Sequence, residues 1–158
     1  MPNPFKRARW YHKISNLTAA PMFRLGPMPR GFLLLTVTGR KTGRRRHRPI
    51  RAIRDGDVYY AVAVLGERSD WLRNVRKNPG VQAKIGRQTV DATAREVTDP
   101  AERERAAELY TETVVPYDRV DYPMVDWGIP TSGQIRKAHR EWLEHGRLVA
   151  IQPRDARK

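Results

Sequence analysis

The sequence lacks cysteine, acidic residues in its first 54 positions, and long apolar runs. Without cysteine the chain forms no disulfide, thiol nucleophile or thiolate metal site, which fits a reducing cytoplasm. No run approaches the ~20 apolar residues of a membrane span, and the N-terminus lacks the apolar core of a signal peptide. The histidines show no metal-ligand spacing, so we expect no metal site. They are His12, His47, His139 and His145.

What the N-terminal third has instead is positive charge. Residues 1–54 contain 14 Lys and Arg, and the remaining residues contain 17 basic and 17 acidic side chains, so the net charge of +14 lies in the first third. The densest part is the segment 39–48, which directly follows the apolar run Phe32–Thr38. A basic turn containing glycines can receive an anion through converging N–H groups and side chains. An ordinary hairpin turn with solvated charges explains the same residues.

Short apolar or alternating segments with tight turns between them predict six strands. Asp55-Gly56-Asp57 is a hairpin signal, and Gly86-Arg87 is a second tight turn. Consecutive short strands of this kind predict a mainly β, α+β fold: an antiparallel split β-barrel with peripheral helices. The predicted strands are Phe32–Thr38, Arg48–Arg54, Val58–Val64, Val81–Ile85, Gln88–Val97 and Arg147–Gln152.

Helices are predicted at both ends of the chain and after the third strand. Residues 5–17 form a basic amphipathic pattern that can lie on an anionic membrane or cover the barrel. Ser69 or Asp70 can cap a short helix over 71–77, and Asp99-Pro100 starts a helix that runs to about Thr113. Residues 114–132 are predicted to be a loop and 132–145 a helix. We expect one domain over 1–158, with 1–31 an N-terminal arm and 114–146 a C-terminal extension.

Aromatic residues offer two candidate walls for a ligand. Trp71 and Asn74 are three apart on one helical face, so an indole and an amide could bracket a flat ring. Tyr110, Tyr117, Tyr122 and Trp127 lie in or beside the acidic stretch 96–126 and could wall an apolar pocket. Packing of these residues in the core is the simpler explanation in both cases.

Several motifs, taken in order, resemble the deazaflavin-dependent nitroreductase and quinone reductase family of actinobacteria. They are Leu33–Gly43, Arg46, Pro49, the turn 55–57, Trp71-x-x-Asn74, Asn78-Pro-x-Val81 and Thr93–Arg95 ahead of Asp99. The resemblance covers roughly residues 30–110. It implies a split β-barrel that binds coenzyme F420, a deazaflavin that carries a phosphate and a tail of glutamates.

The resemblance also implies roles for individual residues. Arg40, Lys41, Thr42, Gly43 and Arg46 would hold the phosphate and the tail. Pro49, Ala63, Val64, Trp71 and Asn74 would line the deazaflavin. Tyr117 and Tyr122 are the candidate proton donors or substrate walls. Relatives often carry a small polar residue and a lysine where this chain has Ala63 and Val64.

The expected function is hydride transfer from reduced F420 to a quinone, an activated alkene or a nitroaromatic compound. Two rivals stay open: an FMN-binding protein on the same barrel, and a module without catalysis that binds nucleic acid or anionic membrane. The reductase hypothesis expects a small-molecule substrate, no specific nucleic acid, a cytoplasmic location with membrane contact limited to residues 5–17, and a monomer or homodimer.

Overall fold

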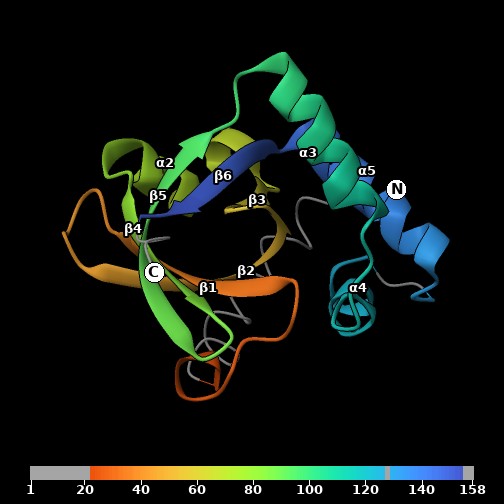
Figure 1. Cartoon of the computed structure of the whole chain (residues 1–158), viewed down its shortest axis with the longest axis horizontal. Coiled ribbons are helices and arrows are strands. Elements are labelled where there is room, and N and C mark those ends of the chain that lie inside the picture. Colours follow the sequence, from red (N-terminus) through yellow and green to blue (C-terminus); the bar gives the residue numbers. More distant parts are fainter. Residues whose placement is uncertain (1–21, 127–128, 155–158) are drawn as a thin grey trace.

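The computed structural model describes residues 22–126 and 129–154. Within these residues six strands form a closed antiparallel barrel in the spatial order β1-β2-β3-β6-β5-β4 (Figure 1). The strands are β1 (Phe32–Thr38), β2 (Arg45–Asp55), β3 (Val58–Ala63), β4 (Gly80–Ile85), β5 (Gln88–Glu96) and β6 (Arg147–Pro153). The predicted antiparallel barrel is confirmed. The predicted helix over 5–17, with its membrane contact, and Trp127 lie outside the described residues.

Glycines in the left-handed region close the two hairpins that the sequence predicts. Gly56 has a φ of 60° between β2 and β3, and Gly86 has a φ of 59° between β4 and β5. Strand β2 begins three residues earlier than predicted, because Thr38 pairs with Arg45 and the ladder continues through the basic residues. The charged segment is therefore partly strand and only partly turn.

Small and branched side chains fill the inside of the barrel, and helix α2 (Asp70–Lys77) closes one end. Trp71, Leu72 and Val75 of α2 belong to the same buried cluster as Leu35 of β1 and Ala61 of β3. Alanines at six inward positions leave room for the larger side chains of α2. Ser69 occupies the N-cap position of α2, but its side chain makes no capping hydrogen bond.

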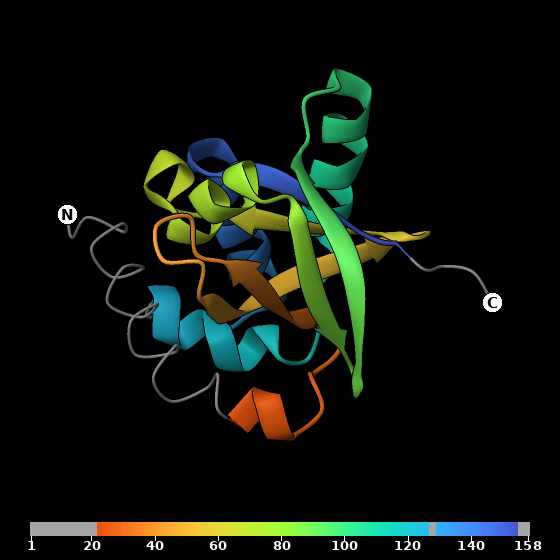
Figure 2. The same cartoon turned by 90° about the vertical axis from the view of Figure 1, so that its left-hand side faces the viewer.

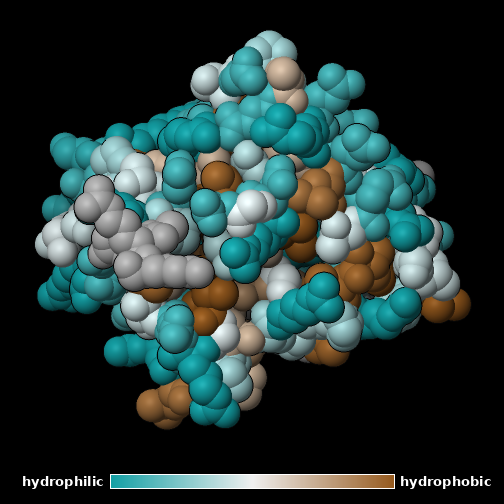
Figure 3. All heavy atoms as spheres, viewed as in Figure 1, coloured by the Kyte–Doolittle hydropathy of each residue, from teal (hydrophilic) through white to brown (hydrophobic). Residues whose placement is uncertain are grey.

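Three helices, α3 (Pro100–Glu112), α4 (Asp118–Asp126) and α5 (Ser132–His145), lie outside the barrel (Figure 2). The outward side chains of β1, β2, β3 and β6 form a second buried cluster with residues of α3 and α5. Helix α3 starts where Asp99-Pro100 predicts it, and Asp99 caps it, since its carboxylate accepts a hydrogen bond from the Glu102 N–H at 2.9 Å. Hydrophilic side chains cover the outer surface over α3 (Figure 3).

The prediction of a loop over 114–132 is wrong for residues 118–126, which form α4. The sequence pattern hides this helix because Pro123 lies inside it, and proline is normally confined to the first turn. Tertiary contacts stabilise it instead: the Asp118 carboxylate is bound to a buried arginine of β2, and Tyr122 packs against Ile135 of α5.

Lysine 84 of β4 attaches the described part of the N-terminal arm to the barrel. Its ammonium group donates to the carbonyls of Phe23, Arg24 and Gly26 at 2.7, 3.0 and 2.6 Å. In the described ranges, no helix is long and apolar enough to cross a membrane. The prediction of a single domain over 1–158 stays a prediction.

Candidate functional site

The turn between β1 and β2 fixes its own shape. The Gly39 N–H donates to the Arg44 carbonyl at 2.7 Å, and the Gly43 N–H donates to the Gly39 carbonyl at 2.8 Å. Gly43 has a φ of 70°, which favours glycine. The Arg44 N–H donates to the Thr42 hydroxyl at 3.3 Å. These three N–H groups are therefore engaged within the turn and do not converge on an anion.

Arginine 40 clamps this turn to helix α2. Its backbone N–H and its Nη1 both donate to Asn74 Oδ1, at 3.0 and 2.9 Å. Its Nη2 forms an ion pair with Asp70 Oδ1 at 3.3 Å. Asn74 is buried, so its two hydrogen bonds are partly sheltered from solvent, whereas the ion pair with Asp70 is exposed. Arg40 therefore holds the basic turn against the helix that closes the barrel.

The two other predicted cations of the turn, Lys41 and Arg46, are unpaired among the described residues. Lys41, Thr42, Gly43 and Arg46 are exposed. Neither Lys41 nor Arg46 forms an ion pair or a side-chain hydrogen bond with any of the described residues. Unpaired neighbouring cations repel one another and favour an anionic ligand. We call the barrel end with Arg40, Lys41, Arg46 and Arg48 the basic end.

Arginine 48 is the site residue that the sequence reasoning missed. It pairs with Leu35, whose side chain lies in the barrel core, so it belongs to the inward row of β2 with Ile50 and Ala52. Arg48 is half-buried, and desolvation lowers the pKa of its guanidinium, while the Asp70 carboxylate opposes that shift. The alternation of β2 was the available signal, since it places Arg48 two residues before a core isoleucine.

The residues predicted to line the deazaflavin do not all share one face of the barrel, because Ala63 and Trp71 belong to the inner cluster whereas Pro49 pairs with Leu34 of the outer cluster. Trp71 is 5% exposed, in the barrel core, and Ala63 is fully buried at the end of β3. Pro49 and Val64 are half-buried. The amide nitrogen of Asn74 has no hydrogen-bond partner within the described segments, so it can still donate to a ligand. Contact of these residues with a cofactor ring stays a prediction.

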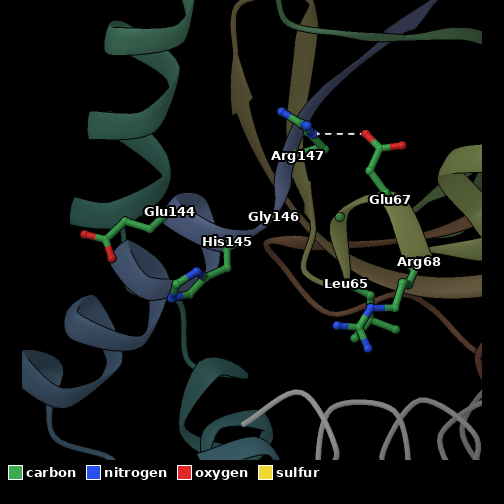
Figure 4. Close-up of a pocket in the computed structure, with 8 residues that line it drawn as sticks. Leu65, Glu67, Arg68, Glu144, His145, Gly146 and Arg147 are labelled. Carbon is green, nitrogen blue, oxygen red and sulfur yellow. Dashed lines mark ion pairs between the residues drawn. The ribbon is translucent and has the colours of Figure 1, made fainter. Parts of the chain in front are cut away.

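A pocket of about 290 Å³ opens where β3 ends and β6 begins (Figure 4). Residues 65–68 form one side and residues 144–147 the other. Figure 4 shows Arg147 and Glu67 directed toward one another, and their ion pair measures 3.3 Å. None of the predicted site residues lines this pocket, although Leu65 directly follows Val64.

The two candidate tyrosines lie in separate clusters. Tyr117 packs edge-on against Phe32 at 4.9 Å between ring centroids, and burial raises the pKa of its phenol. Tyr122 is buried against Ile135 and Ala138. The structure does not bring both phenols to one apolar cluster, so a shared substrate wall stays a prediction.

A buried polar network ties β2 to the start of α4, and it too was missed. Arg51 donates to both carboxylate oxygens of Asp118, at 2.8 and 3.2 Å, and to the carbonyls of Tyr110 and Thr113. Its guanidinium lies 4.4 Å from the centre of the Tyr110 ring. Every contact of this network joins parts of the fold, so its role is structural.

A second titratable group lies next to this network. His139 of α5 is 1% exposed, and its Nδ1 lies 3.3 Å from the Thr111 carbonyl. Burial, together with the nearby Arg51 charge, lowers the pKa of His139 to about 4. The histidine is therefore neutral at pH 7. Across residues 22–126 and 129–154, no three His, Asp or Glu side chains gather as a metal site would require.

Fold and charge together define the class: a split β-barrel protein whose one end is strongly basic. The comparisons with known proteins narrow this class to a family. A family model described as F420H(2)-dependent quinone reductase matches residues 9–130. The chain belongs to that family, and the resemblance of its motifs is confirmed.

Individual relatives agree with this family. An F420H(2)-dependent quinone reductase of Mycobacterium tuberculosis is 37% identical over 68 residues, which are 41% of this chain and 46% of that protein. The match thus spans about half the length of the curated relative. A solved F420-H2 dependent reductase is 25% identical, with a TM-score of 0.53, and the match covers 81% of this chain and 99% of that one. A structure described as a domain-swapped dimer is 20% identical, with a TM-score of 0.56, over 95% and 100% of the two chains. At that identity it shows the fold alone.

Proposed function

We propose that this chain is a reductase that uses reduced coenzyme F420 to reduce a quinone or a similar electron-poor acceptor. The observation that carries the proposal is the set of unpaired cations at the basic end of a barrel of this family. Activated alkenes and nitroaromatic compounds are further acceptors of the same chemical kind. The partner in this proposal is a small molecule.

The basic end fits the anionic part of this cofactor. Lys41 and Arg46 are exposed and unpaired among the described residues, and Arg48 stands behind them on the inward row of β2. Charge-assisted hydrogen bonds contribute about 1.5–3 kcal/mol each, so a few of them support micromolar or tighter binding. A phosphodiester with successive carboxylates can use all three cations.

FMN is the runner-up because it shares the flat ring but carries a single phosphate. It would satisfy fewer of the cations, so we expect it to bind at least about tenfold more weakly than F420. A nucleic-acid or membrane module accounts for the charge but gives no reason for membership in a reductase family.

When it is bound, reduced F420 supplies the hydride. The chain supplies position and charge: Arg40 orients the turn by clamping it to α2, and the free cations hold the anionic groups. Burial raises the pKa of Tyr117, so its phenol stays protonated at neutral pH and is a weaker acid than an ordinary tyrosine. We propose Tyr117 and Tyr122 as proton donors or substrate walls.

The test is a fluorescence titration with F420, beside FMN, of the wild type and the double variant Lys41→Ala/Arg46→Ala. The loss of two charge-assisted contacts at about 1.5 kcal/mol each raises the Kd for F420 roughly 100-fold. The matched control is Arg87→Ala/Lys137→Ala, which removes one exposed arginine and one exposed lysine outside the basic end. Equal or tighter binding of FMN contradicts the proposed cofactor, and normal binding by the double variant shows a solvated surface.

A further inference from the structure

Arginine 48 lies deeper than the other cations of the basic end. Along β2 the inward row runs from Arg46 through Arg48 to Ile50 and Ala52, and the last two belong to the buried core of the barrel. Arg46 is exposed and Arg48 is half-buried. Alternate residues of a strand are about 7 Å apart. The backbone position of Arg48 is therefore about 7 Å closer to the barrel core than that of Arg46.

The charge of Arg48 has no partner of its own. Among the described residues its side chain makes no hydrogen bond and no ion pair within 4 Å. The carboxylate of Asp70 attracts the Arg48 guanidinium from a distance, but Asp70 is already paired with Arg40 at 3.3 Å. Burying a charge without a partner is unfavourable, so Arg48 in this state opposes folding.

We infer that Arg48 binds a phosphate oxygen of the cofactor, while Lys41 and Arg46 take the carboxylates of the tail. The inference rests on the proposed function. A guanidinium fork suits a phosphate, and its attraction is stronger where water is partly excluded. The order along β2 supports the division, because the inner cation meets the anionic group nearest the ring and the outer cations meet the tail that extends into solvent.

The test compares three ligands from which successive parts of the anionic chain are removed: F420, its form without glutamates, and the deazaflavin alcohol without phosphate. Each is titrated by fluorescence against the wild type and Arg48→Met. The methionine replaces the aliphatic stem of the side chain and removes the charged guanidinium. The matched control is Arg45→Met, which removes an exposed arginine from the opposite row of the same strand.

We expect Arg48→Met to weaken both phosphate-bearing ligands at least tenfold and to change the affinity for the phosphate-free alcohol less than twofold. The control should change all three affinities less than threefold. Thermal unfolding without ligand is the independent readout. Because Arg48 is an unpaired charge in the free protein, Arg48→Met should unfold at the same temperature as the wild type or higher.

Three results overturn the inference. They are an unchanged affinity for the phosphate-bearing forms, an equal loss for the phosphate-free alcohol, and a lower unfolding temperature that shows a structural role. If Arg48→Met does not fold, Arg48→Lys replaces it as the test variant, because lysine keeps the positive charge but lacks the forked guanidinium. Arg48→Lys should then lose an intermediate amount of affinity, and only for the two phosphate-bearing ligands. A wild type that binds none of the three ligands contradicts the proposed function itself, whereas normal wild-type binding with an unaffected variant contradicts only the role of Arg48.

Discussion

Replacing Asp118 by asparagine should destabilise the protein strongly, although the residue lies outside the proposed cofactor site. Asp118 and Arg51 are each 3% exposed at their side chains and form an ion pair at 2.8 Å. The second oxygen of Asp118 also accepts a hydrogen bond from the Val115 N–H at 2.8 Å. The substitution removes the negative charge that neutralises Arg51 and turns one of the two acceptor oxygens into an N–H donor, so the buried guanidinium keeps its charge with one amide oxygen and the backbone carbonyls as acceptors.

The expected size follows from this burial. Removing one partner of a buried ion pair costs about 3–5 kcal/mol, because the remaining charge stays desolvated. In a chain of this length 1 kcal/mol shifts the melting temperature by about 2–4 °C, so Asp118→Asn should lower it by roughly 6–20 °C. The assay is thermal and urea-induced unfolding, followed by circular dichroism at pH 7.

Glu112→Gln is the matched control, since it also converts an acid to an amide. Glu112 is 56% exposed at its side chain and pairs with Arg136 and Arg140 at 3.5 and 3.9 Å. Exposed pairs contribute at most about 1 kcal/mol. Arg51→Met/Asp118→Leu removes both buried charges and should recover part of the loss. If Asp118→Asn costs no more than Glu112→Gln, the reasoning about the buried pair is refuted.

Two further predictions concern α5 and its ends. The pKa of His139 in the folded protein, about 4, lies below its ordinary value of about 6.5, so below pH 6.5 the unfolded state binds a proton that the folded state does not. The contribution of His139 to the free energy of unfolding is therefore complete above about pH 6.5 and falls by up to ~1.4 kcal/mol per pH unit toward pH 4. Urea midpoints of His139→Gln should therefore fall less over that range than those of the wild type, and parallel curves contradict this. Gly146→Ala should prevent normal folding, since its Cβ would lie 2.6 Å from the carbonyls of Ala63 and Trp142, whereas Gly133→Ala meets no atom within 4 Å and should be neutral or stabilising by up to about 1 kcal/mol. Similar melting temperatures for the two variants would falsify that contrast.

The strands were predictable because apolar runs, alternation and turn residues agree with one another. Asp55-Gly56-Asp57 closes a hairpin where the sequence places it, and α3 starts at Asp99-Pro100 as predicted. These signals are local, since each depends on residues only a few positions apart. The family resemblance is likewise carried by short motifs in order.

Alternation along β2 assigns Arg48 and Arg51 to opposite rows, but their surroundings were not predictable, because those come from distant segments. Both lie in β2, whose sequence is rich in arginine. The register with β1 turns Arg48 toward the barrel core, and the packing of α3 and α4 against the opposite face of the sheet buries Arg51. A strand pattern states which residues share a face, but not whether that face meets solvent. The helix over 118–126 was missed for the same reason, since a contact 67 residues away along the chain holds its first residue.

The clamp between Arg40 and Asn74 restricts how this sequence can diverge. One amide oxygen accepts both a backbone N–H and a guanidinium N–H of Arg40. A replacement at position 74 must keep an acceptor at that point, or the basic turn loses its hold on the helix that closes the barrel. A replacement at position 40 removes only one of the two bonds, because the backbone donor remains. Substitutions should therefore be accepted more readily at position 40 than at position 74, and a loss at 74 should call for compensating changes in the turn.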